Sequence, residues 1–396
     1  MSLTLDSSSA FAPKSLEEAQ AWLRQPPHSF SFLGGGSKAR FSANECLVFH
    51  TTSLPQHCRH VAEDMTVRVS AGTPWADLQK QLALHGQELP LDVAHPQRAT
   101  VGGVVASPIP GVREFGTGGL RNWLIGLQAI DGRGRAFQAG GQVVKNVAGY
   151  DLTRLMIGSG GAFGLITELS FQVAPKPEGQ LWKILALESI SDLLAWLQAL
   201  KSSACRPMAM EVLPSACAPW IDPDFPLQEN PAPWRLALLW QGSKMALTSR
   251  RDQVKALSQN LPQRNSVWLQ QSELDLLTAL VHWPDPNASH YFQGRVPLAA
   301  YAEFLQQCQQ GSLNFRLSAG EGWCFGPWSE KNQNRQNWLP SWLVSKGGLW
   351  RSFADSNLQI LPPPQQESAW PWLQRLRQVF DPDHRIRSPL WPEPEV

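Results

Sequence analysis

The stretch that decides the fold is KNVAGYDLTRLMIGSGGAFGLITE, residues 145–168. It contains a turn with four glycines within seven residues, 158–164, which runs directly into the apolar, β-prone segment 165–173. Because glycine has no side chain, the backbone N–H groups of such a turn can approach a large, negatively charged ligand without steric conflict. The stretch therefore predicts a site for a nucleotide cofactor.

Two common nucleotide-binding loops do not fit this turn. A Rossmann fingerprint needs a third glycine at the sixth position from Gly158, where this chain has Phe163, and it leads from a strand into a helix. Here the turn leads into a predicted strand. The sequence also contains no Gly-x-x-x-x-Gly-Lys-Ser/Thr run, the signature of a P-loop.

Two further glycine clusters lie upstream. The apolar segment 30–33 predicts a short strand and leads into GGGSK, residues 34–38. Three residues without side chains, followed by a hydroxyl group and a cation, are suited to a pyrophosphate. The second cluster is PQRATVGGVVAS, residues 96–107, continued by GVREFGTGGLR, residues 111–121. Its adjacent glycines again allow the backbone to touch a ligand closely.

The four motifs GGGS, TVGGVVA, KNVAGYDL and GSGGAFGLITE follow one another in this order. Their order and spacing resemble the FAD-binding domain of the vanillyl-alcohol oxidase and p-cresol methylhydroxylase (PCMH) superfamily. The form VKNVAGYD, residues 144–151, is similar to the FAD-binding E subunit of bacterial glycolate oxidase. The resemblance covers roughly residues 15–175 and is specific because four separated motifs agree.

The resemblance implies FAD as the cofactor and a set of residues that bind it. These are Gly34, Gly35, Gly36, Ser37, Lys38, Pro96, Thr100, Val101, Gly102, Gly103, Ala106, Ser107, Gly116, Lys145, Asn146, Gly149, Tyr150, Gly158, Ser159, Gly161, Gly164 and Ile166.

Structural roles stay open for several of these residues. Gly34 to Gly36 can be a tight turn, and Thr100, Gly102 and Gly103 can mark a β-bulge or a helix entry. Lys145 and Asn146 can equally hold a loop by hydrogen bonds. A structural role is favoured for Tyr150 and for Asp151, which is not in the implied set and is a good N-cap for a helix running to Met156.

Composition predicts two different domains. Of the 30 glycines, 21 fall in residues 1–175, whereas 15 of the 18 tryptophans follow that segment. The chain of 396 residues also exceeds the length at which a single core stops growing. We expect a flexible N-terminus over 1–14, the FAD-binding domain over 15–175, a cap or partner-interaction domain over 180–383, and a proline-rich tail over 384–396.

The expected fold class is α+β: a two-lobed PCMH-type FAD-binding domain, then a smaller α+β cap domain with an antiparallel sheet. The first domain should contain strands at 47–51, 66–70, 124–130 and 165–173, a helix at 75–85 and a hairpin turn at 131–134. The second should contain strands at 182–187, 234–241, 267–269 and 291–296, and helices at 190–201, 251–260, 298–310 and 370–380.

Charge and hydropathy disfavour other classes. The net charge is +1 with scattered cations, so no basic stripe suggests nucleic acid. No apolar run of about 18 residues and no leader peptide is recognisable, so we expect a cytoplasmic protein without a transmembrane segment. Association with a membrane through partners stays open. The six cysteines form no Cys-x-x-Cys pair. An iron–sulfur cluster, if one is used, would therefore belong to a partner.

The sequence assigns no metal site and no catalytic residue. His57 and His60 lie three residues apart, and His282, His290 and His384 are isolated. D-2-hydroxyacid dehydrogenases of the resembled superfamily carry a close histidine cluster in the second half, which this chain lacks. Independent glycolate oxidation by this subunit is therefore in question.

The function implied is that of an FAD-binding subunit in a glycolate oxidase complex, with a second flavoprotein and an iron–sulfur subunit as partners and a small 2-hydroxy acid as substrate. The complex would oxidise glycolate to glyoxylate and pass the electrons to a partner acceptor. Two alternatives remain open: a non-catalytic FAD relay or scaffold subunit, and a self-sufficient flavin oxidase of another 2-hydroxy acid.

Overall fold

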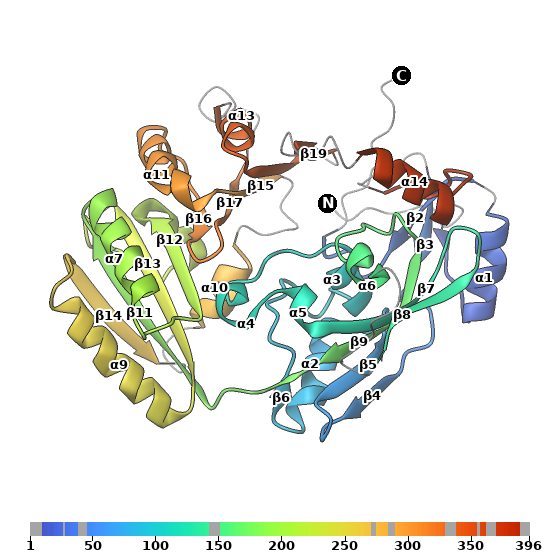
Figure 1. The fold of residues 1–396 in the computed structure, drawn as a ribbon, viewed down its shortest axis with the longest axis horizontal. Coiled ribbons are helices and arrows are strands. Elements are labelled where there is room, and N and C mark those ends of the chain that lie inside the picture. The colour runs from blue at the N-terminus through green and yellow to red at the C-terminus, as the bar shows by residue number, and fades with distance from the viewer. Residues whose placement is uncertain are drawn as a thin grey trace. The chain divides into compact units, whose positions relative to one another are not determined.

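The structure is a computed structural model that describes residues 10–26, 28–38, 46–141, 151–270, 275–283, 290–328, 338–354, 357–361 and 370–388. The chain divides into two compact units (Figure 1). The first comprises Met1–Ile109, Gly118–Lys176 and Ser368–Val396, and the second Pro110–Thr117 and Pro177–Glu367. The division into functional domains at 15–175, 180–383 and 384–396 remains a prediction.

The first unit contains two sheets. A three-stranded parallel sheet has the order β1-β3-β2, and a five-stranded antiparallel sheet has the order β4-β5-β9-β7-β8. The strands are β1 (Ala10–Phe11), β2 (Phe30–Leu33), β3 (Leu47–His50), β4 (Cys58–Val61), β5 (Thr66–Ser70), β6 (Gln87–Glu88), β7 (Leu124–Ile130), β8 (Ala136–Gly140), β9 (Leu165–Gln172) and β10 (Ala174–Pro175), with β6 pairing β10. The helices are α1 (Leu16–Arg24), α2 (Trp75–Ala83), α3 (Val101–Ala106), α5 (Leu120–Trp123), α6 (Leu152–Met156) and α14 (Trp370–Phe380).

Most expected elements of the first unit are confirmed. The strands predicted at 30–33, 66–70 and 124–130 have these bounds, and those predicted at 47–51 and 165–173 end one residue earlier. The helix predicted at 75–85 ends at Ala83, and Gly86 follows with a φ of +63°. The turn at 131–134 joins β7 to β8, and the Asp131 carboxylate accepts the backbone N–H groups of Arg133 and Arg135.

Helix α1 was not predicted, although its start signal is in the sequence. The Ser15 hydroxyl accepts the backbone N–H of Glu18 at 3.1 Å, so it caps the helix. Ala19 and Leu23 are fully buried on its inner face, where they pack with Phe30 and Phe49. This small core stabilises the three-stranded sheet, whose strand β2 leads into the GGGSK loop.

The second unit is built on a nine-stranded antiparallel sheet with the order β14-β11-β13-β12-β16-β17-β15-β18-β19 (Figure 1). The strands are β11 (Gly179–Leu187), β12 (Ala209–Pro214), β13 (Trp234–Gly242), β14 (Asn265–Gln270), β15 (His290–Arg295), β16 (Arg316–Ser318), β17 (Trp323–Pro327), β18 (Leu349–Ala354) and β19 (Asn357–Leu361). The helices are α4 (Glu114–Thr117), α7 (Ile190–Ser202), α8 (Ala218–Ile221), α9 (Lys244–Ser258), α10 (Leu276–Val281), α11 (Tyr301–Gln310) and α13 (Trp338–Ser345), with short 3₁₀ turns at Ser215–Cys217 and Leu298–Ala300.

Both faces of this sheet are covered where it is apolar. Leu185, Val212 and Leu236 pack with residues of α7, α11 and α13, whereas Ile184 and Ala237 pack with α10 on the opposite face. Trp182, Trp196, Trp240 and Trp350 are among the largest fully buried side chains. The tryptophans of this half therefore serve chiefly as core residues, and the predicted antiparallel sheet is confirmed.

Candidate functional site

The GGGSK loop follows β2 and lies against the segment 98–100. A Cβ atom added to Gly34 would overlap the Thr100 side chain, and one added to Gly35 would overlap the carbonyl oxygen of Arg98. The loop is therefore glycine-rich because two stretches of chain lie too close for side chains.

The backbone N–H groups of this loop are available. None of the five N–H groups from Gly34 to Lys38 donates a hydrogen bond to a residue that the structure describes. Gly36 adopts a left-handed conformation with a φ of +64°. Successive N–H groups that turn through such a conformation form a concave anion-binding nest. This geometry fits the predicted pyrophosphate cradle.

Two cationic side chains border the loop. The Lys38 ammonium donates to the Ser107 carbonyl oxygen at 2.8 Å, and the Arg98 guanidinium donates to the Gly36 carbonyl oxygen at 3.1 Å. Although part of the Lys38 side chain is exposed, burial lowers the pKa of its ammonium to about 7. An anion beside Lys38 would favour the charged form.

The TVGGVVA motif forms the short helix α3. Thr100 is its N-cap, and the Thr100 hydroxyl accepts the Gly103 N–H at 3.2 Å. The N–H groups of Val101 and Gly102 donate to the carbonyl oxygens of Thr73 and Ala71. A Cβ atom at Gly102 would lie 2.7 Å from that of Ala71, so this glycine permits close packing. The first turn of α3 thus uses its N–H groups within the protein.

The glycine turn 158–164 also uses N–H groups for hydrogen bonds within the protein. The N–H groups of Gly158 and Gly160 donate to the carbonyl oxygens of Val105 and Ala106, and that of Gly164 donates to the carbonyl oxygen of Gly161. The expectation that this turn offers free N–H groups to a ligand is therefore wrong for these three glycines. Its four glycines are needed for backbone conformation, because all of them have a positive φ, from +56° at Gly160 to +128° at Gly164.

The structure brings three of the predicted glycine clusters together. The GGGSK loop packs on the segment that enters α3, the end of α3 accepts hydrogen bonds from the 158–164 turn, and a Cβ at Gly161 would lie 3.0 Å from the Phe32 ring. Gly36, Lys38, Gly103, Ser107 and Gly158 remain partly or fully exposed along this contact. They form the accessible part of the predicted site.

Other predicted residues are placed differently. The side chains of Val101 and Ile166 are buried in the main core of the first unit, and Pro96 contributes its carbonyl oxygen to the Ala76 N–H. Gly116 belongs to the second unit, where a Cβ would lie 2.6 Å from the Cα of Met208.

Four predicted residues, Lys145, Asn146, Gly149 and Tyr150, lie outside the described residues. The neighbouring prediction for Asp151 is confirmed, because its carboxylate caps α6 by accepting the Arg154 N–H at 3.1 Å.

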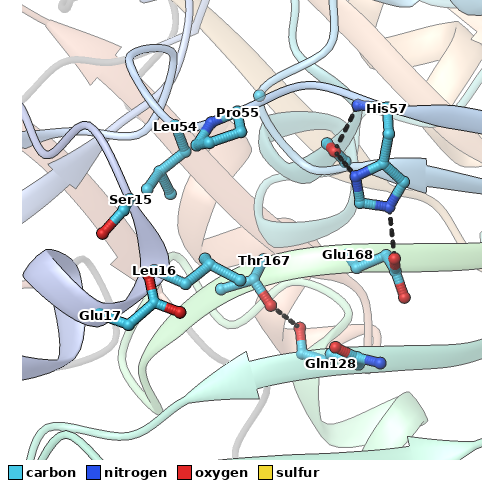
Figure 2. Close-up of a pocket in the computed structure, with 11 residues that line it drawn as sticks. Ser15, Leu16, Glu17, Leu54, Pro55, His57, Gln128, Thr167 and Glu168 are labelled. Carbon is cyan, nitrogen blue, oxygen red and sulfur yellow. Dashed lines mark hydrogen bonds and ion pairs between the residues drawn. The ribbon is translucent and has the colours of Figure 1, made fainter.

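Sequence reasoning missed a polar group in the first unit. His57 Nδ1 lies 2.8 Å from the Ser70 hydroxyl, and His57 Nε2 lies 2.5 Å from the Glu168 carboxylate (Figure 2). Arg68 donates to the same carboxylate. The pairing of β5 with β9 places Ser70 opposite Glu168. The sequence holds no signal for this group because its members are up to 111 residues apart.

A second polar group is buried in the second unit. The Glu211 carboxylate accepts the Arg316 guanidinium at 3.0 Å and the Ser318 hydroxyl at 2.8 Å, and all three residues are at most 6% exposed. Burial also raises the pKa of nearby Glu321 to about 7. Arg316 and Glu211 neutralise each other's charge, as the partners of a buried ion pair must, and we assign them no catalytic role.

Metal ligands and paired cysteines are not seen in the described chain. Among the described residues, no group of three His, Cys, Asp or Glu side chains could hold a metal ion. All six cysteines are free thiols, and Cys205, Cys217, Cys308 and Cys324 are buried. No helix in the described ranges is long and apolar enough to cross a membrane.

Comparison with known proteins agrees with the glycine clusters. Residues 8–140 match the FAD binding domain family. Over 137 residues the chain is 39% identical to glycolate oxidase subunit GlcE of Escherichia coli, which covers 34% of this chain and 39% of the relative. It is 30% identical over 151 residues to glycolate oxidase subunit GlcD of Bacillus subtilis, which covers 38% of this chain and 32% of the relative.

A further relative is D-2-hydroxyglutarate dehydrogenase of Xanthomonas citri, 31% identical over 199 residues, or 48% of this chain and 42% of the relative. The chain thus spans between 32% and 42% of the length of these three relatives. Among solved structures, alkyldihydroxyacetonephosphate synthase shares the fold over 95% of this chain and 75% of its own, with a TM-score of 0.68 at 15% identity.

Proposed function

We propose that this chain, whose residues 8–140 match the FAD binding domain, is an FAD-binding subunit of a glycolate oxidase complex that oxidises glycolate to glyoxylate. The observation that carries the proposal is the row of five backbone N–H groups from Gly34 to Lys38 that donate to no described residue. Such a row fits the pyrophosphate of a dinucleotide cofactor.

The residues present fit the cofactor in chemistry as well as in shape. The loop supplies N–H donors to the phosphate oxygens, and Lys38 supplies a positive charge at the same rim. Gly103 and Gly158 place no side chain on the accessible surface, and the space at Gly158 is open, since a Cβ there would meet nothing closer than 3.8 Å. Bound FAD would supply the two-electron redox chemistry, while the protein binds and orients it.

The partners belong to the proposal as well. Oxidation of one glycolate to glyoxylate releases two electrons and two protons, and the electrons need an acceptor. We infer that a second flavoprotein subunit and an iron–sulfur subunit complete the complex. Support comes from the two relatives that are named as subunits of glycolate oxidase.

A relay or scaffold role is the second candidate. It is favoured by two polar groups of the described chain that are internally paired, His57 with Glu168 and Arg316 with Glu211. Neither group includes a residue of the GGGSK loop, of α3 or of the 158–164 turn, so neither supplies a base from within the predicted flavin site. In this case the chain would hold FAD while a sister subunit performs the oxidation.

The test is the visible spectrum of the purified chain after FAD reconstitution, before and after anaerobic addition of glycolate. A flavin band that bleaches makes the chain a catalytic subunit, and a band that persists moves oxidation to a partner. The absence of any bound flavin would overturn the proposal. Gly86→Ala is the matched control for Gly35→Ala, since it also changes a glycine but lies after α2, outside the predicted site, where an added Cβ meets nothing within 4 Å.

A further inference from the structure

A cavity of about 250 Å³ opens in the first unit between the start of α1, the segment 54–57 and the five-stranded sheet (Figure 2). Its lining does not include any residue of the GGGSK loop, of α3 or of the 158–164 turn. It is therefore separate from the predicted flavin site. His57, Ser70 and Glu168 lie together on its wall.

These three side chains form one hydrogen-bond network. Ser70 Oγ already accepts the backbone N–H of His57 at 2.9 Å, and it lies 2.8 Å from His57 Nδ1. With neutral His57, a proton on Nε2 donates to Glu168 at 2.5 Å, which leaves Nδ1 to accept the proton of the Ser70 hydroxyl. This is the order of roles in a serine–histidine–carboxylate triad, which is recognised by geometry and not by sequence position.

Burial and an ion pair hold this hydrogen-bond network in place. Glu168 is 9% exposed and its second oxygen accepts the Arg68 guanidinium, so the carboxylate is fixed in orientation. Ser70 is 4% exposed, whereas the His57 side chain is 56% exposed. The hydroxyl is thus held beside its base, and the base remains accessible.

We propose that Ser70 is a nucleophile and that this cavity is an acyl-transfer site for small esters. The Ser70 oxygen forms a bond to the acyl carbon while its proton passes to His57 Nδ1. The alcohol leaves as its C–O bond breaks, taking that proton. Water then attacks the acyl-serine, His57 removes a proton from the water and returns it to Ser70, and a carboxylic acid is released.

The size and lining of the cavity define the acyl group. A volume of about 250 Å³ lies below the roughly 300 Å³ at which pockets for drug-sized ligands begin, so only a short acyl chain fits. Leu16, Leu54 and Pro55 provide an apolar wall on the side away from Glu168 (Figure 2). A short-chain ester with an uncharged acyl group therefore matches the cavity.

The experiment is incubation of the intact purified chain with 4-nitrophenyl acetate, followed by mass mapping of acetylated peptides. We expect acetylation at Ser70, loss of that adduct in Ser70→Ala, and a fall in its rate of about 10²-fold in His57→Gln. Ser170→Ala is the matched control, because Ser170 is also buried in the same sheet, at 8% exposure, and should leave the rate unchanged.

An unmodified Ser70 in the folded wild-type chain would overturn the proposal, as would acetylation that persists at the wild-type rate in His57→Gln. A purely structural hydrogen-bond network predicts the first of these outcomes. Because the decisive reading is on the wild-type chain, it does not depend on whether Ser70→Ala folds.

Discussion

The GGGSK loop and the 158–164 turn are both rich in glycine, but they use it for opposite purposes. In the loop, neighbouring backbone crowds Gly34 and Gly35, and the five N–H groups of residues 34–38 have no described acceptor. In the turn, every glycine has a positive φ, and the N–H groups of Gly158, Gly160 and Gly164 donate to carbonyl oxygens of the protein. A high density of glycine therefore indicates close packing or a positive φ, whereas N–H groups without a described acceptor indicate a site for an anion.

Gly35→Ala should have the largest effect, since it breaks the loop. The added Cβ would overlap the backbone of Arg98, which has no flexible end to move aside. We expect a loss of more than about 3 kcal/mol in the free energy of unfolding and no measurable FAD binding. Urea unfolding and flavin titration check this, and wild-type stability with normal binding would show that the loop does not pack as described.

Gly164→Ala should break the turn without touching the loop. Its φ of +128° is open only to glycine, and a Cβ would overlap the Ile130 carbonyl oxygen. We expect a loss of about 3 kcal/mol in the free energy of unfolding, with the FAD dissociation constant of the folded protein nearly unchanged. A variant that keeps wild-type stability but loses FAD would reverse the roles that we assign to the two segments.

Lys38 should make FAD binding depend on pH. Its pKa of about 7 lies below the value of about 10.4 in an unfolded chain, so the protein without cofactor gains stability as pH rises from about 7 to about 10. A bound pyrophosphate favours the charged ammonium and raises this pKa. The affinity for FAD should therefore weaken above pH 7, by up to about tenfold per pH unit.

Lys38→Met removes this dependence. The variant should bind FAD about tenfold more weakly than the wild type at pH 6, and the difference should shrink towards pH 9. Calorimetric titration at several pH values measures both constants. If the FAD dissociation constants of the two proteins change with pH in parallel, Lys38 does not interact with the cofactor.

Gly158→Ala should have the smallest effect. Its φ of +76° strains an L-residue, but the nearest atom to a Cβ, on Pro108, is 3.8 Å away. We expect a loss of about 1 kcal/mol in the free energy of unfolding, measured by urea unfolding. A loss as large as that of Gly164→Ala would mean that space, and not only backbone conformation, is limiting at this position.

The local pattern of the sequence was enough to predict several strands and helices, but it missed others, such as β12, β18 and α10. The segments 66–70 and 124–130 are short apolar runs between turn residues, and the structure gives them as β5 and β7. Helix α1 was missed although the sequence carries its signal. Ala19 and Leu23 lie four residues apart on one face, and Ser15 and Glu18 mark its start. The order of the nine-stranded sheet depends on long-range pairing and leaves no local trace.

The site was predictable only in part for the same reason. Residues such as Gly35 and Thr100 were identified by motif, but the sequence could not show that the 158–164 turn consumes its own N–H groups within the fold. Nor could it bring Ser70 and His57 to Glu168, because the pairing of β5 with β9 does so.

Amide hydrogen exchange of the purified chain, with and without FAD, tests the central claim most directly. If the free N–H groups of residues 34–38 hold the pyrophosphate, FAD should slow their exchange by at least about tenfold. The exchange at Gly158, Gly160 and Gly164, already hydrogen-bonded, should change far less. Bound FAD that leaves exchange at residues 34–38 unaltered, or protects the 158–164 turn instead, would contradict the account.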